Sequence, residues 1–348
     1  MNVILISNSS QPTSGWGTMT HNHCLALARA GIPFVLLKPP FLPDLPLGFN
    51  WRNFWRIPYL FQVPDLKPGK DTVIHSLLDF PTAVLGWRLA KKYKLPFVFT
   101  AHGTYSVLPF TRFFDRRLFL PVYRGANQII AVSNFTARKM RELSGCQRPI
   151  DVISNPAALP AGFGQEDFSI MDKIPKGKKI ILAVGPSKGR KGIDVLISAL
   201  PLITKEVPAA YLAVVGDQEK EGENFRMFKN LPARQLAALF ANCAVFALTP
   251  RYLNHEFEGY GLVYLEAGLY KKPVVGSLSG GVPEAVIDGE TGLLVPENDH
   301  RAAAVAIIKI LKNSELAERL GEGGYRLAKE RNWDSYIDKV IKIYHNLV

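Results

Sequence analysis

Two glutamates, Glu258 and Glu266, lie in the stretch HEFEGYGLVYLEAG, where most of the neighbouring side chains are apolar. Residues 261–270 (GLVYLEAGLY) are apolar on every side of a helix, and such a helix is normally buried. A carboxylate in a buried helix is costly unless something donates hydrogen bonds to it. Two explanations fit: structural glutamates that reach the surface or an internal partner, or carboxylates that hold a polar ligand.

Basic residues and glycines follow two of the expected strands. Arg190 and Lys191 lie in AVGPSKGRKGIDVLISAL, between a strand and an amphipathic helix, a position that suits a diphosphate as well as a solvated loop. Gly15 and Gly17 precede a helix after the first strand, and glycine-rich turns at helix N-termini bind phosphate through backbone N–H groups. A dinucleotide-binding dehydrogenase is disfavoured, because Lys38 stands where a ribose-binding acid is expected.

These residues need a framework to position them, and the chain alternates short β-rich runs with helical patterns. The expected strands of the first half are NVILIS, PFVLLK, TVIHS, PFVFTAH, QIIAVS and IDVISN, and those of the second half are KIILAVGP, YLAVVGD, AVFALTP, PVVGS and GLLVP. Two βαβ series joined by a linker with Pro and Gly predict two doubly wound α/β domains. A ligand is then expected at the carboxyl ends of the strands, in a cleft between the domains.

Composition and charge narrow the class of protein. The 348 residues are 47% hydrophobic and begin without the basic n-region of a signal peptide, and we find no apolar run of about 18 residues. The three cysteines lack the spacing of a metal site or a disulfide pair, so we expect a cytoplasmic protein. Residues 1–160 hold 18 Lys and Arg against 7 Asp and Glu, a net charge of +11, whereas the remainder holds 24 against 23. This excess indicates an anionic partner for the first half (nucleic acid, an acidic lipid surface or a phosphate-bearing substrate), or a charge that only aids solubility.

The motifs as an ordered set are similar to one known family. In chain order they are FTAHGTY, IIAVSNFTARKM, VISNP, EFEGYGLVYLEAGLYKKPVVGSLSGGVPEAVIDGETGLLV and ERNWDSYIDKVIKIYHNLV. The sequence resembles the retaining glycosyltransferases of family 4, whose signature is two glutamates separated by seven residues, as Glu258 and Glu266 are. The resemblance implies the GT-B arrangement: an α/β fold of two Rossmann-like doubly wound domains that face each other across a cleft, with a C-terminal helix crossing back to the first domain. It places the acceptor domain at residues 1–160, with 330–348 packing on it, and the nucleotide-sugar donor domain at 161–329.

The same resemblance assigns roles to the candidate site residues. Glu266 matches the glutamate that holds the ribose hydroxyls, and Glu258 matches the one that contacts the transferred sugar. His102, in TAHGT, matches the active-site histidine, to which we assign contact with the donor sugar and help in orienting the reacting centre. The other expected donor-binding positions are Gly15 and Gly17, the cations Arg190 and Lys191, Leu231 near the nucleobase, and the backbone of Gly261 and Leu262 at the diphosphate. Many relatives carry an arginine where this chain has Pro186, and Arg190 is a candidate to supply that charge.

The expected reaction follows from the resemblance. It implies a retaining, metal-independent transfer of a hexose, with UDP-glucose favoured, to a glycan or lipid-linked acceptor in cell-envelope polysaccharide or glycolipid synthesis. The chain contains no Asp-x-Asp motif, and we expect neither a metal nor a cofactor. Two alternatives are a sugar-nucleotide epimerase of the same fold and a nucleic-acid-binding protein, although we find no nucleic-acid-binding motif.

The acceptor side is expected to meet a membrane. Residues 49–61 (FNWRNFWRIPYLF) and 110–124 (FTRFFDRRLFLPVYR) interleave aromatic side chains with arginines. Such segments suit an interface with anionic lipids, and core elements with basic edges are the alternative. We therefore expect peripheral attachment at the inner face of the cell membrane through the N-terminal domain. His75 is expected to line the acceptor cleft, whereas His21, His23 and His255 are interpreted as surface residues.

Overall fold

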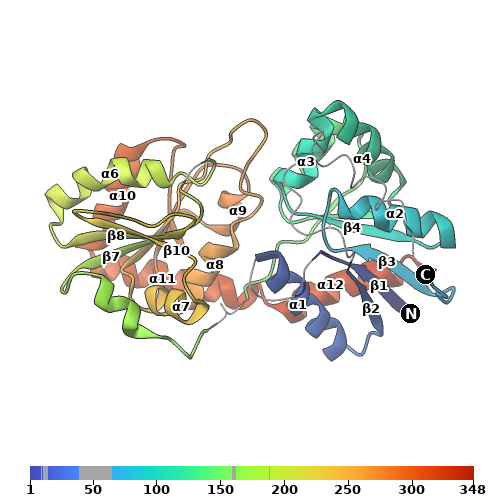
Figure 1. Cartoon of the computed structure of the whole chain (residues 1–348), viewed down its shortest axis with the longest axis horizontal. Helices are drawn as coiled ribbons and strands as arrows, with labels where there is room; N and C mark the ends of the chain where they lie inside the picture. The colour runs from blue at the N-terminus through green and yellow to red at the C-terminus, as the bar shows by residue number, and fades with distance from the viewer. Residues whose placement is uncertain (9, 11–14, 39–64, 159–161, 188) are drawn as a thin grey trace. The chain divides into compact units, whose positions relative to one another are not determined.

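The structure is a computed structural model of the whole chain, and it describes all residues except 9, 11–14, 39–64, 159–161 and 188. Internal contacts divide the chain into two units, which Figure 1 shows in colours that follow the sequence. The first unit comprises Met1–Asn155 and Trp333–Val348, and the second comprises Pro156–Asn332. The expected boundary at residues 160 and 161 lies outside the described residues, and so does the aromatic segment 49–61.

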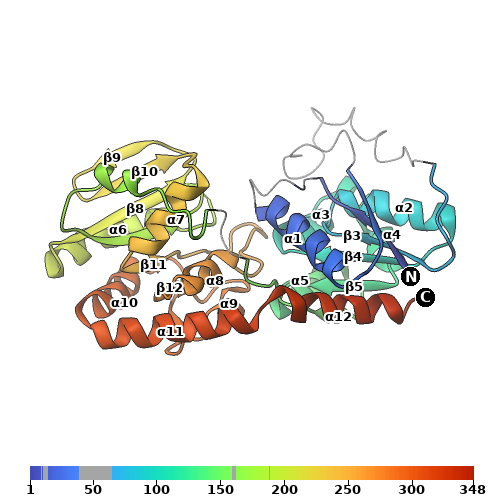
Figure 2. The same cartoon turned by 90° about the horizontal axis from the view of Figure 1, so that it is seen from below.

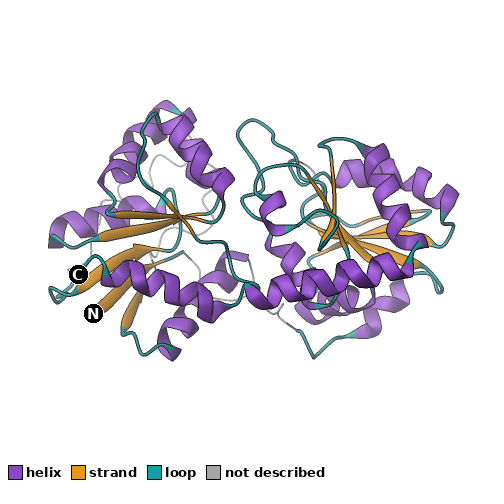
Figure 3. Cartoon of the chain, turned by 180° about the vertical axis from the view of Figure 1, so that it is seen from behind, coloured by secondary structure: helices purple, strands orange, loops and turns teal. Residues whose placement is uncertain are grey.

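The first unit is built on a six-stranded parallel sheet with the order β2-β1-β3-β4-β5-β6. Its strands are β1 (Asn2–Ile6), β2 (Phe34–Leu37), β3 (Thr72–Ser76), β4 (Phe97–Ala101), β5 (Gln128–Ala131) and β6 (Asp151–Val152). Every residue of β3 and β4 is buried, because helices cover both faces of the sheet (Figure 3). The last predicted strand, IDVISN, forms only the short β6.

The first unit contains the helices that the periodicity predicts between its strands, and a further helix at the C-terminal end of the chain. They are α1 (Gly15–Arg29), α2 (Thr82–Tyr93), α3 (Thr104–Thr111), α4 (Phe113–Gly125), α5 (Asn134–Ser144) and the C-terminal α12 (Trp333–His345). Helix α5 begins after Ser133, whose hydroxyl accepts a hydrogen bond from the backbone N–H of Thr136 at 3.1 Å. Helix α1 is described from Gly15 onwards, and residues 11–14 before it lie outside the described residues, so Gly15 and Gly17 lie within the helix instead of preceding it. The prediction that both glycines precede the helix is therefore wrong, whereas their role in donor binding stays a prediction.

Helix α12 returns to the first unit, where it lies beside α1 (Figures 1 and 2). Its Tyr344 hydroxyl is 2.5 Å from Nδ1 of His75, whose Nε2 lies 2.9 Å from the Thr100 hydroxyl. The ring of His23 packs edge-on against His75 and against Tyr336 of α12. Both histidines are buried, because His75 of β3 and His23 of α1 pack against each other and against aromatic residues of α12. The expectations that His75 lines an acceptor cleft and that His23 lies on the surface are wrong.

The second unit is built on a seven-stranded sheet with the order β13-β12-β11-β7-β8-β10-β9. Its strands are β7 (Lys179–Val184), β8 (Ala210–Gly216), β9 (Lys220–Gly222), β10 (Phe225–Lys229), β11 (Val245–Ala247), β12 (Val274–Ser277) and β13 (Gly292–Val295). Only β9 pairs in the antiparallel sense, with β10, among the described strands. The edge strand β9 and its neighbour β10, from the stretch KEGENFRMFK, were not among the expected strands, because charged and polar residues interrupt their apolar residues.

The helices of the second unit complete the doubly wound pattern. They are the 3₁₀ helix η2 (Phe168–Lys173), α6 (Ile193–Glu206), α7 (Ala233–Asn242), α8 (Leu262–Leu269), α9 (Val282–Ala285), α10 (His300–Lys312) and α11 (Ser314–Glu330). Helices and parallel strands in two α/β units confirm the predicted fold class. In the described part of the chain, no helix has both the length and the apolar character that a membrane crossing requires.

Candidate active site

Glu258 lies in the loop that leads into α8, between two buried aromatic residues. Phe257 and Tyr260 are packed inside the second unit, so the loop is anchored on both sides of the glutamate. The backbone N–H of Gly281 donates to the Glu258 carbonyl at 2.8 Å. Gly280 has a φ of +58°, and a Cβ at that position would lie 2.4 Å from the same carbonyl oxygen, so glycine is required there. The SGG turn after β12 therefore fixes the Glu258 backbone.

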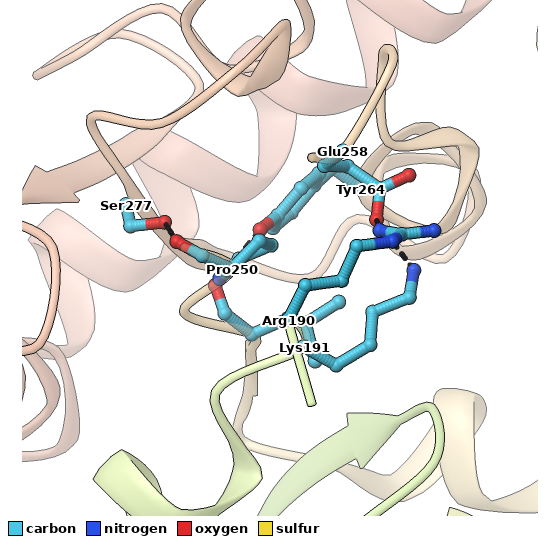
Figure 4. Close-up of polar contacts among 7 residues, drawn as sticks. Arg190, Lys191, Pro250, Glu258, Tyr264 and Ser277 are labelled. Atoms are coloured by element: carbon cyan, nitrogen blue, oxygen red, sulfur yellow. Dashed lines mark hydrogen bonds and ion pairs between the residues drawn. The ribbon is translucent and has the colours of Figure 1, made fainter. Parts of the chain in front are cut away.

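Two cations share one oxygen of this carboxylate (Figure 4). Oε2 of Glu258 lies 2.8 Å from Nη1 of Arg190 and 2.5 Å from Nζ of Lys191. The Glu258 side chain is 13% exposed, so solvent screens the pairs little. Burial alone would raise the pKa of Glu258, but the charges of Lys191 and Arg190 outweigh it and lower the pKa to about 2. Glu258 is therefore ionised at neutral pH and held between two positive charges.

The turn between β7 and α6 brings Arg190 and Lys191 to this position. The Arg190 carbonyl accepts from the backbone N–H of Arg251 at 2.8 Å, and the Gly192 carbonyl accepts from the Thr249 hydroxyl at 2.9 Å. Gly192 has a φ of +72°, and a Cβ there would lie 1.9 Å from the Thr249 carbonyl oxygen. The basic turn is thus bonded to the segment that follows β11, and it is a built part of the site instead of a solvated loop.

Glu266 has a different environment from Glu258, although both lie in one motif. It is half-buried in the middle of α8, and no hydrogen bond joins its carboxylate to another described residue. Burial raises the pKa of Glu266 to about 7, and the positive charge of Lys191 opposes this only in part. Pairs of acidic groups with pKa values pushed apart are typical of functional sites. The two glutamates are therefore suited to different partners.

The helix start between the two glutamates offers further polar groups. Gly261 caps α8 in a left-handed conformation, with a φ of +98°, and Leu262 is the first helical residue. The N-terminus of a helix carries unpaired N–H groups and a partial positive charge that favour anions. Leu231 is half-buried and lies before Pro232, the residue that caps α7. The expected role of Leu231 at the nucleobase stays a prediction.

His102 belongs to the first unit, at the end of β4, and its ring has a defined orientation. Nε2 of His102 lies 2.8 Å from the carbonyl oxygen of Leu77, which only accepts, so Nε2 carries a proton. Burial lowers the pKa of His102 to about 4, although the bond to Leu77 opposes the shift. The ring is then neutral at pH 7, and its Nδ1 is a hydrogen-bond acceptor. Trp16, between Gly15 and Gly17 in the first turn of α1, packs edge-on against the ring at 4.8 Å.

Three residues beside His102 were not predicted as site residues. Asp79 follows β3 and accepts hydrogen bonds from the backbone N–H of His102 at 3.2 Å and from the Ser106 hydroxyl at 2.5 Å. Trp16 packs edge-on against the His102 ring, and Ser106 and Asp79 accept hydrogen bonds from the backbone of the same turn. A polar residue after a strand and a tryptophan between two glycines are signals in the sequence for Asp79 and Trp16, whereas Ser106 has none. In the described residues, no group of three or more His, Cys, Asp or Glu side chains is arranged to hold a metal ion.

Two family models match successive parts of the chain. The model described as glycosyltransferase family 4 matches residues 13–159, and the model described as glycosyl transferases group 1 matches residues 165–327. The GDP-mannose-dependent alpha-(1-6)-phosphatidylinositol monomannoside mannosyltransferase of Mycolicibacterium smegmatis is 29% identical to this chain over 279 residues, covering 73% of this chain and 70% of the relative.

Solved structures show the same fold. Sucrose-phosphate synthase from Thermosynechococcus elongatus superposes with a TM-score of 0.78 at 22% identity, covering 100% of this chain and 99% of that one. The Anabaena protein HepE in complex with UDP-glucose superposes with a TM-score of 0.73 at 17% identity, covering 100% of both chains. The two matched models and this fold lead to one conclusion: the chain is a glycosyltransferase with the GT-B fold, of the family 4 type.

Proposed function

We propose that this glycosyltransferase moves a hexose from a nucleotide-diphosphate sugar, with retention of anomeric configuration and without a metal. UDP-glucose is the favoured donor, and a glycan or lipid-linked molecule of cell-envelope polysaccharide or glycolipid synthesis is the acceptor. The observation that carries the proposal is the cluster of Arg190, Lys191 and Glu258, with both cations on one carboxylate oxygen. Two cations next to a helix N-terminus are suited to a diphosphate that leaves with negative charge.

The donor is proposed to bind along the motif from Glu258 to Glu266. Its diphosphate takes hydrogen bonds from Arg190, Lys191 and the N-terminus of α8, in competition with the Glu258 carboxylate. Glu258 then accepts from hydroxyl groups of the sugar, and Glu266 accepts from those of the ribose. Glu266 has no partner among the described residues that this contact would have to break.

The proposed chemistry proceeds on one face of the sugar. The bond between the anomeric carbon and the phosphate oxygen breaks through an oxocarbenium-like state, and the acceptor oxygen bonds to the face that the phosphate leaves. The acceptor proton passes to the departing phosphate, so no side chain has to act as base. His102 is neutral at pH 7 and contacts the sugar through Nδ1, where it orients the reacting centre. Arg190 and Lys191 stabilise the charge that develops on the diphosphate, which is the task a metal has in other enzymes.

The similar proteins differ in their donors, so they support both UDP-glucose and GDP-mannose. HepE was solved with UDP-glucose, whereas the mycobacterial relative is named as GDP-mannose-dependent. We favour UDP-glucose and would test it with a thermal-shift panel of UDP, UDP-glucose, GDP and GDP-mannose. A ligand present at about 100 times its dissociation constant stabilises the folded protein by about 2.7 kcal/mol. A larger shift with GDP-mannose than with UDP-glucose would contradict the donor assignment.

Product analysis tests the reaction itself. With the preferred donor and a lipid or glycan acceptor fraction, we expect a transferred product with the donor's anomeric configuration, as read by proton NMR, and undiminished rates after exhaustive chelation. Inverted product would contradict retention, and loss of activity that magnesium or manganese restores would contradict metal independence. An isomerised donor without any transfer would instead indicate an epimerase.

The acceptor is proposed to be reached at a membrane surface through α4. Phe113 and Phe114 at the start of this helix are 68% and 71% exposed, and the exposed Arg117 lies over the Phe113 ring. Adjacent aromatic and basic side chains suit the interface of a bilayer with anionic lipids. The name of the mycobacterial relative likewise specifies a phosphatidylinositol-linked acceptor.

Arg116 in this segment has a structural role. The Arg116 guanidinium donates to the carbonyl oxygens of Phe110, Leu143 and Ser144, and so ties α3 and the end of α5 to α4. Arg116 therefore supports the fold, and Arg117 is the better residue with which to examine lipid binding.

A further inference from the structure

The turn that carries His102 is held from the interior by a carboxylate that the proposed reaction does not use. Asp79 is 3% exposed, and its Oδ2 accepts from the His102 backbone N–H at 3.2 Å and from the Ser106 hydroxyl at 2.5 Å. The Ser106 oxygen in turn accepts from the backbone N–H of Gly103 at 3.2 Å. A single carboxylate oxygen thus ties together both ends of the turn from His102 to Ser106.

The same interior segment orients the ring of His102. Leu77, two residues before Asp79 in the chain, provides the carbonyl oxygen that lies 2.8 Å from Nε2. This contact places the ring proton on Nε2 and leaves the lone pair of Nδ1 available. Trp16 packs edge-on against the ring and limits its rotation. Residues 77–79 therefore set both the position of the His102 backbone and the tautomer of its side chain.

The main chain and the side chain of Asp79 have different partners. The Asp79 carbonyl accepts from the backbone N–H of Ala83 at 2.8 Å, at the start of α2. That bond uses only the main chain, so it persists when the side chain is changed. The carboxylate oxygen Oδ2, by contrast, receives its described hydrogen bonds from residues of the His102 turn.

We propose that Asp79 is a positioning residue for His102, and that with Ser106 and the Leu77 carbonyl it presents Nδ1 of His102 as an acceptor for a hydroxyl of the transferred sugar. The contact with the sugar rests on the proposed function, whereas the positioning of the ring does not. Asn at position 79 retains an oxygen that can accept both hydrogen bonds, while Ala retains none. The hydrogen-bond geometry therefore predicts opposite outcomes for these two substitutions.

The test combines ring NMR of His102 with transfer kinetics in the full chain. The protein is labelled with ¹⁵N-histidine, and His102→Gln assigns the His102 signals by their loss. In the unmodified protein, and in Asp79→Asn, we expect the pattern of a single tautomer with the proton on Nε2. In Asp79→Ala we expect mixed tautomers and a kcat lowered by about tenfold or more, with little change in the KM for the donor, because a displaced group loses mostly transition-state contact. Ser106→Ala is expected to show a smaller change in the same direction.

The matched control is Ser144→Ala, which removes a buried hydroxyl from the end of α5 in the same unit and leaves the His102 turn intact. An unchanged His102 pattern in folded Asp79→Ala, or equal damage in Asp79→Asn and Asp79→Ala, would overturn the proposal. If Asp79→Ala does not fold, Ser106→Ala takes its place, and an unchanged ring pattern with an unchanged kcat there would overturn it. Mixed tautomers with undiminished transfer would instead contradict the contact between His102 and the sugar, and with it that part of the proposed function.

Discussion

Each unit of this protein holds a carboxyl group that is buried or nearly buried, Glu258 in the second unit and Asp79 in the first. The pKa values of these two groups are shifted in opposite directions. In the second unit, the pKa of Glu258 is lowered to about 2, because Lys191 and Arg190 outweigh the effect of burial. In the first unit, burial raises the pKa of Asp79 to about 7, and the hydrogen bonds from Ser106 and the His102 backbone offset this only in part. The difference is whether the carboxylate's partners carry full charge.

The contrast indicates that the polar groups of the second unit stabilise charge, whereas those of the first unit define geometry. Full positive charges in a partly buried site stabilise a leaving group that becomes negative, and hydrogen bonds to charged groups contribute about 1.5–3 kcal/mol. Neutral donors and acceptors contribute less, about 0.5–1.5 kcal/mol each, but they define geometry without attracting counter-ions. Substitutions in the charged cluster of the second unit should therefore affect the rate most, and those at neutral groups of the first unit should affect orientation or stability.

The largest effect is expected for Glu258→Gln. Transfer should fall by about 100-fold or more, because the carboxylate that contacts the sugar in the transition state is lost. Binding of free UDP should not weaken and should become tighter, since the glutamine amide at position 258 carries no negative charge that competes with the diphosphate for Arg190 and Lys191. Steady-state kinetics and calorimetric titration with UDP measure the two quantities. Equal losses in UDP and UDP-glucose affinity would place Glu258 at the ribose or diphosphate instead.

Glu266→Gln should weaken the binding of UDP and UDP-glucose alike, by about 1.5–3 kcal/mol for a lost charge-assisted hydrogen bond. Because the pKa of Glu266 is raised to about 7, the unmodified protein should also lose nucleotide affinity as the pH falls below 7. The variant serves as the control for protonation of the nucleotide itself. Parallel pH profiles for the two proteins would show that Glu266 is not the titrating contact.

Acid should destabilise the first unit through its buried histidines. Burial, and secondarily the charge of His102, lowers the pKa of His23 to about 3 in the folded state, against 6.5 when unfolded. The stability contributed by this neutral ring is complete above pH 6.5 and is lost as the pH falls towards 3. At pH 5 the loss is on the order of 2 kcal/mol. In urea unfolding, His23→Leu should reduce the difference in stability between pH 7 and pH 5 by that amount, whereas His21→Leu at an exposed position should not.

The smallest effect is expected at α4. Arg117→Ser should weaken binding to anionic vesicles at low salt by about 1 kcal/mol, or about fivefold, without changing UDP affinity. Lys176→Ser, which removes an exposed cation from the second unit, is the matched control. Vesicle co-sedimentation measures both variants. Binding of the unmodified protein to neutral vesicles as strong as to anionic ones, or no binding to either, would contradict the membrane proposal.

Much of the framework was predictable, because its signals are local. Alternating apolar runs identified the strands that carry His102 and the basic turn, and the motif around Glu258 and Glu266 indicated a glycosyltransferase before any fold was known. The hairpin of β9 and β10 was not predicted, because β9 is polar and the apolar residues of β10, among them the buried Met227 and Phe228, are interrupted by charged ones. The place of β10 in the sheet depends on its pairing with β8. Local periodicity predicts a strand from the strand's own residues, but it does not predict a polar edge strand that forms because it pairs with a neighbouring strand.

The fold class, the motif residues and the positive charge of the first half are set by composition and short-range spacing, so they can be predicted from the amino-acid sequence. The partners of each polar group, by contrast, depend on how the chain folds. Lys191 and Glu258 are 67 positions apart, and His75 and Tyr344 are 269 apart, yet each pair is within hydrogen-bonding distance. Burial and such long-range partners set the pKa values that separate Glu258 from Glu266 and make His23 and His75 part of the core. The burial of a side chain and its long-range partners cannot be predicted from its neighbours in the chain, because both depend on which distant segments the fold brings together.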